Sequence, residues 1–278
     1  MESAGVEETV DNPLMKTLVV VEHRARELAN RLWNDISIYA YGMEMGARVI
    51  NTTFLEHIRF WRFLHVIYAR AVDIATRRTC GVWTTGTPKF LPPTVPPSKK
   101  FEAYNTLYFF GWLFRNPAGL KKHRDALVAK FAPSKSVQEK INGIMNPLQS
   151  KHVRIGVHMR QRPFKGFENG EFLVPRARVL EIVKEYLLEH NIKKEDVALV
   201  EVSDIGGHKD DLTGLHLLSK CDVVIGTNST FSNLSAWFGN VPHIVTTNEP
   251  IDWPYYSDKS TYFDNKYATF THGSLLYP

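Results

Sequence analysis

The stretch CDVVIGTNSTFSNLSAWFG, residues 221–239, contains a short apolar strand followed directly by a helix. The continuous run of valine and isoleucine is typical of a strand buried on both faces of a sheet. The polar residues at 227–230 then mark the start of the helix, and PHIVTT (residues 242–247) is the next strand. A strand, a helix and a strand in this order predict a parallel sheet.

The same alternation extends in both directions along the chain. Towards the N-terminus, strands are expected at HVRIGVHM (152–159) and VALVEVSD (197–204), with helices at 175–190 and 209–219. An earlier block begins with TLVVVEH (17–23), a helix at 25–46 and ARVIN (47–51). Between the blocks we expect an aromatic-rich helix at 55–76, an irregular proline-rich loop at 88–100, and helices at about 101–115, 118–131 and 135–146.

Two blocks of alternating strands and helices indicate the α/β class, with two Rossmann-like domains that face each other across a cleft. We place the N-terminal domain at residues 1–150 and the C-terminal domain at 151–278, with the tail after Asn248 packing back across both. The chain has 278 residues, which suits two domains of about 100–150 residues each.

Composition excludes several classes of function. A net charge of +5 is too small to indicate nucleic-acid binding, and KKHRDALVAK (121–130) is typical of a solvated helix face. No apolar run is long enough to predict a membrane span. The opening MESAGVEETVDN is acidic and polar, unlike a secretory leader, so we expect a cytoplasmic location.

Polar side chains gather where three strands of the second block end. His158, Arg160 and Arg162 follow the first strand and are potentially cationic. The other two ends carry Ser203, Asp204 and His208, and Thr227, Asn228, Ser229 and Thr230. Ligands of open α/β sheets bind beyond these strand ends, and the helix start, with Asn228 or Ser229 as its N-cap, favours an anion. Any one of these groups alone is equally well explained as a helix cap or a surface charge.

The acidic residues point away from a bound metal. The chain has no Asp-x-Asp pair, and Cys80 and Cys221 have no metal-binding spacing. Neither a phosphate-binding loop with Gly-Lys-Ser/Thr nor a Gly-x-Gly-x-x-Gly motif is present, which disfavours kinases, ATPases and dehydrogenases. We therefore expect no metal and no cofactor, and a diphosphate neutralised by arginine, histidine and helix amides.

These segments resemble the fucosyltransferase superfamily, which includes α1,2-, α1,6- and protein O-fucosyltransferases. The similarity lies in HVRIGVHMRQR, VEVSD, SKCDVVIGTNSTFSNLSAW and LANRLWNDISIYAYGMEMGARVIN, in that order along the chain. The resemblance implies the two-domain GT-B architecture and an inverting, metal-independent glycosyltransferase whose C-terminal domain binds the nucleotide sugar. Under this resemblance Phe231 joins the donor-binding residues.

The small size of the chain favours one branch of the fucosyltransferase superfamily. Short relatives of this size resemble the capsid-glycan enzymes of large algal viruses, including a β-xylosyltransferase. The resemblance therefore implies UDP-xylose as donor and a viral capsid N-glycan as acceptor, in the host cytoplasm. GDP-fucose is the alternative donor.

The catalytic base is expected in the N-terminal domain, with Arg160 and His158 stabilising charge on the leaving diphosphate. Asp35 and Glu44 could equally be solvated acids of a helix face, and Glu56 is a further candidate. Asp73, the sole acid in VIYARAVDIATRR, is the preferred base; it could instead form an ion pair with Arg70 or Arg77.

A different class of function stays open. RARELA (24–29) replaces the glycine-rich loop found in the resembling enzymes. The chain could therefore be a lectin-like or inactive nucleotide-binding module that kept the fold and lost turnover.

Overall fold

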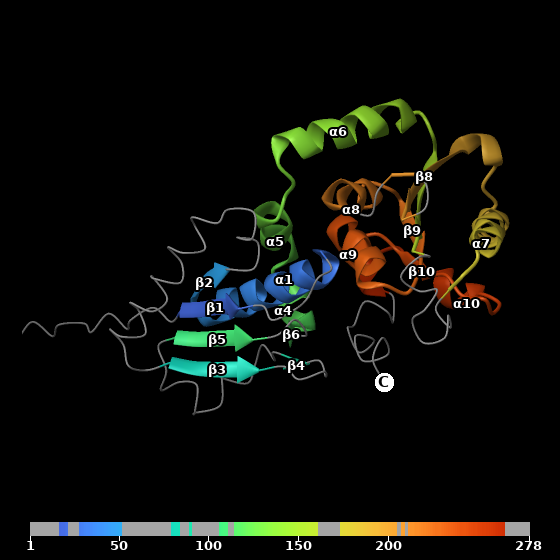
Figure 1. Cartoon of the computed structure of the whole chain (residues 1–278). Helices are drawn as coiled ribbons and strands as arrows, with labels where there is room; N and C mark the ends of the chain where they lie inside the picture. The colour runs from blue at the N-terminus through green and yellow to red at the C-terminus, as the bar shows by residue number, and fades with distance from the viewer. Residues whose placement is uncertain are drawn as a thin grey trace, which may run out of the picture.

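The computed structural model describes residues 17–21, 28–51, 79–83, 89–90, 106–110, 114–160, 173–204, 207–208 and 211–264. Its first half contains a parallel sheet in the order β2-β1-β5-β3 (Figure 1). The elements are β1 (Thr17–Val21), α1 (Leu28–Met45), β2 (Arg48–Asn51), β3 (Thr79–Trp83) and β5 (Thr106–Phe110). Two further strands, β4 (Lys89–Phe90) and β6 (Phe114–Arg115), pair to form a two-stranded parallel sheet.

The second half contains another parallel sheet, in the order β10-β9-β7-β8. Its strands are β7 (Val153–Met159), β8 (Val197–Ser203), β9 (Val223–Gly226) and β10 (His243–Val245). The helices are α7 (Arg176–Glu189), α8 (Leu212–Leu218), α9 (Thr230–Gly239) and α10 (Trp253–Tyr256). Three helices connect the two halves: α4 (Pro117–Lys122), α5 (Arg124–Lys130) and α6 (Lys135–Met145). Single 3-10 turns occur at η2 (Asn146–Leu148), η5 (Lys194–Asp196) and η6 (Tyr262–Asp264).

The predicted α/β class with parallel sheets is confirmed, and the second block agrees with its predicted elements to within a few residues. The prediction is wrong in the first half at 101–115, where β5 and β6 replace the expected helix. Strand β5 lies between β1 and β3, and its alternate residues Leu107 and Phe109 are both 1% exposed. A period of two in buried apolar residues is the strand pattern, and β-branched and aromatic residues favour it.

Other differences are smaller. Lys89–Phe90 forms a strand inside the segment 88–100 that was expected to be irregular, and β3 was not predicted. The helix expected at 118–131 is divided at His123 into α4 and α5. The helix expected at 55–76 lies outside the described residues.

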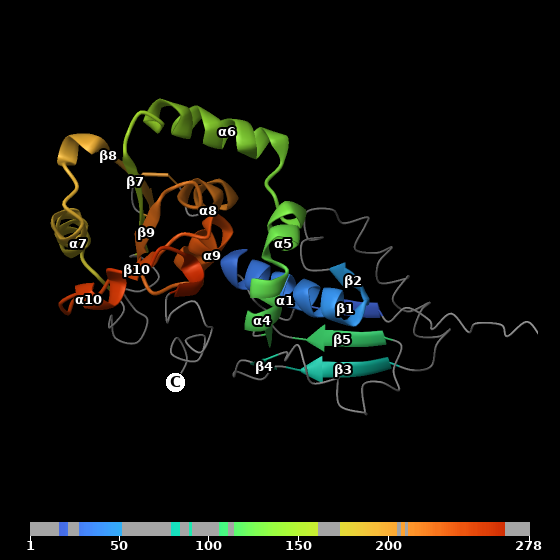
Figure 2. The same cartoon turned by 180° about the vertical axis from the view of Figure 1, so that it is seen from behind.

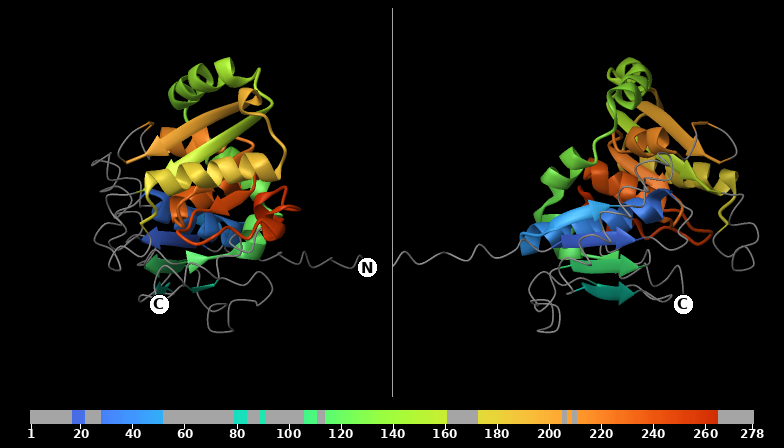
Figure 3. Two further views of the ribbon diagram at one scale, coloured as in Figure 1. Left: turned by 90° about the vertical axis from the view of Figure 1, so that its right-hand side faces the viewer. Right: turned by 60° about the vertical axis from the view of Figure 1, so that its left-hand side comes forward.

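The second sheet has helices on both faces. Ile155, Val157 and Met159 of β7 pack in one cluster with α7. The alternate residues Gly156 and His158 therefore face α8 and α9 on the other side. Figure 3 shows α7 in front of the strands of this sheet in its left panel.

The two halves share one apolar core. This cluster joins Trp33 and Ile36 of α1 with Leu120 of α4 and with residues of α8 and α9. Seen from both sides, the N-terminal end of α1 reaches α9 of the second half (Figures 1 and 2). The helical layer between the sheets is therefore continuous across the halves.

Candidate active site

Connections in the second sheet reverse direction between β7 and β9. The chain leaves β7 for β8 on one side, and it leaves β9 for β10 on the other. Neighbouring parallel strands whose connections diverge leave an opening at their carboxyl ends, which is where open α/β sheets bind ligands. The residues just beyond these two strands are Arg160 after β7 and Thr227–Ser229 after β9. Two of the three polar strand ends predicted from sequence therefore meet at this switch point.

His158 connects β7 to the first turn of α9. Its Nδ1 lies 2.7 Å from Ser232 Oγ and 3.5 Å from Thr227 Oγ1, and its ring stacks on Phe231 with centroids 4.7 Å apart. The side chain is fully buried. Burial first, and then the charge of Arg160 and the proximity of His243, lower the pKa of His158 to about 3.

This pKa corrects the sequence-based expectation of a cationic residue at 158. Burial disfavours the charged imidazolium, so His158 is neutral at neutral pH. It contributes a hydrogen bond and a flat ring to the base of α9. Its assignment as a catalytic residue stays a prediction.

The first turn of α9 is built around Ser229. Its hydroxyl accepts a hydrogen bond from the Ser232 amide at 3.2 Å and lies 3.2 Å from the Ser232 hydroxyl. Ser229 is therefore the N-cap, which decides between the two predicted candidates. The other amides of the first turn have no partner within the helix, and the helix dipole is positive here. The free amides and the positive helix dipole therefore both favour an anion at this end of α9.

Gly226 permits the close approach of β9, β7 and α9. A Cβ atom at this position would lie 2.7 Å from Ser232 Oγ and 3.0 Å from His158 Cβ. Any side chain would therefore push apart the helix start and the strand beside it. Sequence reasoning did not single out Gly226 or Ser232, because the known capping box has Glu or Gln where Ser232 stands, so no local signal marked that serine.

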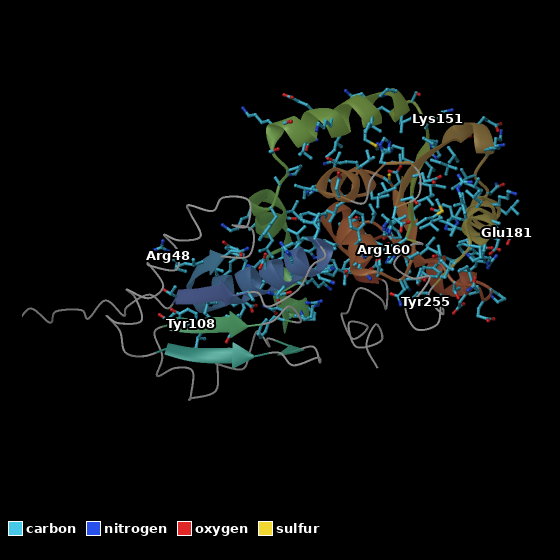
Figure 4. The ribbon with its side chains drawn as sticks, in the orientation of Figure 1. Arg48, Tyr108, Lys151, Arg160, Glu181 and Tyr255 are labelled. Carbon is cyan, nitrogen blue, oxygen red and sulfur yellow. The ribbon has the colours of Figure 1, made fainter. Side chains whose placement is uncertain are left out.

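Arg160 directly follows β7 and is half-buried; Figure 4 labels its side chain within the second half of the molecule. After burial, its charge is the next cause that lowers the pKa of His158. Ser203 and Asp204 end the neighbouring strand β8, and the Asp204 amide donates to the Met159 carbonyl at 3.4 Å. These two residues therefore lie next to the switch point.

His208 lies farther away. Its amide donates to Glu201 O and its carbonyl accepts from the Ser203 amide, so it pairs with β8 on the edge opposite β7. Gly207, with φ of +69°, makes the turn. His208 lines a cavity of about 410 Å³ together with Lys140, Ile144, Asp211, Thr213 and Gly214. Strand β8 thus separates it from Arg160.

The acids considered as bases in α1 are not solvated, so that expectation is wrong. Asp35 is fully buried in the middle of the helix. Glu44 has a side chain only 6% exposed; it accepts from Asn116 Nδ2 at 3.3 Å and lies 4.0 Å from His123 Nε2. Asn116 in turn caps α4, so Glu44 has a structural role at that helix start. Arg162, Glu56 and Asp73 lie outside the described residues.

In the described part of the chain, the His, Cys, Asp and Glu side chains form no group of three that could hold a metal ion. The helices of that part include none that is long and apolar enough to cross a bilayer.

No protein-family model matches the sequence, and no curated protein matches it. Solved structures do match. An Arabidopsis thaliana FUT1 variant in complex with GDP aligns over 86% of this chain and 72% of its own, at 12% identity and a TM-score of 0.50. POFUT1 in complex with GDP-fucose aligns over 85% of this chain and 99% of its own, at 11% identity and a TM-score of 0.50.

The chain has the GT-B fold. At these identities the likeness establishes architecture, and the GT-B class predicted from sequence is confirmed. In an open α/β sheet the switch point is where ligands bind. Here that place is occupied by Arg160 and the α9 N-terminus.

Proposed function

We propose that this GT-B protein is a glycosyltransferase that takes a sugar from a nucleotide-sugar donor and transfers it to a glycan acceptor. The observation that carries the proposal is the convergence of Arg160 and the N-terminus of α9 at the β7–β9 switch point. A guanidinium and a set of helix amides are complementary to a diphosphate in both charge and hydrogen bonding. His158 and Ser232 support this surface from beneath.

The reaction would be a single displacement with inversion. An acceptor hydroxyl oxygen forms a bond to the anomeric carbon while the bond from that carbon to the diphosphate oxygen breaks. The hydroxyl proton passes to a base, and the electron pair of the broken bond leaves with the nucleoside diphosphate. Arg160 and the α9 amides oppose the negative charge that grows there, each group contributing about 10²-fold in rate. No step requires a metal, so we propose a metal-independent enzyme.

The base would come from the first half of the chain. Asp73 stays the prediction for this role, and the burial of Asp35 and the hydrogen bonding of Glu44 make both weaker candidates than the sequence suggested. We also keep the predicted cytoplasmic location as part of the proposal.

Two donors have support. The solved structures with this fold contain GDP and GDP-fucose, which supports GDP-fucose. The sequence resemblance to short viral enzymes supports UDP-xylose, which stays the sequence-based prediction. The neutral His158 and the α9 amides would serve either diphosphate.

Calorimetric titration with GDP, UDP, GDP-fucose and UDP-xylose, with and without EDTA, tests the proposal. We expect one base to bind at least 10-fold more tightly than the other, with no effect of EDTA. Donor turnover is then measured as release of the nucleoside diphosphate. Loss of binding in EDTA that Mg²⁺ restores would contradict metal independence, and binding without turnover would favour the inactive module.

Arg160→Ala tests the leaving-group role, with Arg154→Ala as the matched control. Arg154 lies in β7, the strand that Arg160 follows, but it pairs with Asp222 near the start of that strand, through bonds of 2.7 and 2.9 Å. We expect Arg160→Ala to lower turnover about 10²-fold and Arg154→Ala to leave it within about twofold of the wild type. Equal turnover in the two variants would rule out the role of Arg160.

A further inference from the structure

Helix α9, which begins at the candidate diphosphate site, is held at both ends, by α1 of the first half and by the connecting helix α5. At its first turn, Trp33 Nε1 of α1 donates to the Thr230 carbonyl at 3.1 Å. Towards the C-terminal end of α9, the ring of Trp33 meets the ring of Trp237 edge to face, with centroids 5.6 Å apart. Both tryptophans are fully buried. These contacts fix the start of α9 against the N-terminal end of α1.

At the other end of α9, Arg124 of α5 completes the attachment. Its Nε donates to the Trp237 carbonyl at 3.0 Å and its Nη2 donates to the Phe238 carbonyl at 2.6 Å. The last carbonyls of a helix carry its negative end, so a guanidinium is well placed there. The Trp237 carbonyl also accepts from the Asn240 amide at 3.2 Å. Burial lowers the pKa of Arg124, although Asp125 opposes this effect.

The second half also holds α9 by itself. Its N-cap bonds to Ser232, the His158 ring stacks on Phe231, and its apolar side chains join α8 and the sheet. The donor site is therefore assembled within the second half. What Trp33 and Arg124 determine is the position of that site relative to the first half.

We propose that Trp33 and Arg124 are positioning residues that lock the donor site to the first half, so that the catalytic base and the acceptor meet the donor at one fixed separation. This inference rests on the proposed function. It implies a protein that turns over without opening at the α1–α9 contact. Since the error of a single ångström in alignment can cost about 10²-fold in rate, loosening this contact should affect turnover far more than donor binding.

Arg124→Met and Trp33→Phe test the inference. Both keep apolar bulk and remove the donated hydrogen bonds. Arg124→Met also removes the charge that pairs with Asp125, and Trp33→Phe also removes part of a fully buried ring. Arg178→Met is the matched control, because Arg178 has the same 18% exposed side chain and also donates to two carbonyls, those of Thr247 and Glu249, but within the second half. Nucleotide affinity is measured by calorimetry, and turnover is measured as GDP or UDP release from GDP-fucose or UDP-xylose with water as acceptor.

We expect Arg124→Met and Trp33→Phe to lower turnover at least about 10-fold while the Kd for the nucleoside diphosphate changes less than about threefold. Arg124→Lys should restore part of the turnover, since an ammonium keeps the charge but lacks the fork that reaches two carbonyls. A merely stabilising role would lower the melting temperature of Arg124→Met and Arg178→Met alike and leave turnover equal in both. That result, or a fall in nucleotide affinity as large as the fall in turnover, would overturn the inference.

Failure of the proposed function has a different signature. If the wild-type protein binds neither nucleotide, the function is wrong, and amide hydrogen exchange still tests the lock. Arg124→Met should then speed exchange in α5 and α9 together, whereas Arg178→Met should leave both unchanged. Exchange in α9 that stays at the wild-type rate in Arg124→Met would overturn the lock itself.

Discussion

His158 Nδ1 and Ser232 Oγ lie 2.7 Å apart, and this one hydrogen bond joins the end of the central strand β7 to the first turn of α9. Both groups are completely buried. The Ser232 hydroxyl also lies 3.2 Å from that of the N-cap Ser229, so the strand, the helix start and the cap form one polar chain beneath the candidate diphosphate site. The geometry of that site therefore depends on a bond that no ligand would touch.

Removing Ser232 Oγ should weaken the whole second half. Ser232→Ala leaves Nδ1 of His158 without its close partner in a buried environment, and a buried polar group without a partner costs about 1–3 kcal/mol. We expect the free energy of unfolding in urea to fall by that amount. Ser257→Ala is the control, since its hydroxyl donates to the Pro254 carbonyl at an exposed position. Similar small losses in both variants would show that the buried bond contributes little.

Adding a methyl group at Gly226 should damage the site directly. The new Cβ of Gly226→Ala would lie 2.7 Å from Ser232 Oγ, so α9 or β7 must shift, at a cost of about 1–3 kcal/mol. Calorimetry should show weaker nucleotide binding, because the amides of the first turn move with the helix. At Gly143, inside α6, a Cβ meets nothing within 4 Å. Gly143→Ala should therefore raise stability by about 0.5–1 kcal/mol, and a loss at both glycines would refute the steric argument.

Acid should destabilise the protein well above the usual range of carboxylates. Burial is the largest cause that lowers the pKa of His158 to about 3 and the pKa of His216 and His243 to about 4, against 6.5 for an exposed histidine. The folded state keeps these rings neutral while the unfolded state binds protons. Stability is therefore complete above pH 6.5 and falls as the pH decreases from there towards 4.

Below pH 6.5 the free energy of unfolding should fall by about 1.4 kcal/mol per pH unit for each of these buried histidines. Urea unfolding between pH 7 and pH 5 measures it, in a window above the ordinary pKa of aspartate and glutamate. His216→Phe should reduce the slope by the contribution of one proton, because phenylalanine cannot bind a proton in the unfolded state. A phenyl ring can keep the contact that the His216 ring makes with Phe238. A urea midpoint that does not change from pH 7 to pH 5 would contradict the burial of neutral rings.

The second half could be predicted from sequence almost element by element. Its strands are short apolar runs bounded by clear polar ends, as in the segment around Val223–Gly226. Its helices start at proline, serine or aspartate caps. Local chemistry and tertiary structure agree there. The first half agrees with its predicted elements at β1, α1 and β2. It differs at Thr106–Phe110, which is aromatic-rich and compatible with a helix face until its neighbours β1 and β3 are known.

The candidate site divides in the same way. The polar strand ends at Arg160 and Ser229 were visible in sequence because parallel strands bring their carboxyl ends to one edge. Which of them meet was not visible, because strand order is a property of the sheet. It places His208 beyond the outer edge of β8 and Arg160 at the switch point.

By itself, the sequence determined the α/β class, the parallel second sheet and the residue types that suit a diphosphate, because alternation of strands and helices and the chemistry of strand ends are local patterns. The tertiary structure alone decided that His158 is neutral, that Asp35 is buried, that Glu44 binds Asn116, and that α9 is shared between the halves. Burial, pKa and contacts such as that of Trp33 with Thr230 arise between residues distant in the chain, here 197 positions apart. No local pattern specifies such pairs, since they exist only once both sheets and the helical layer between them have packed.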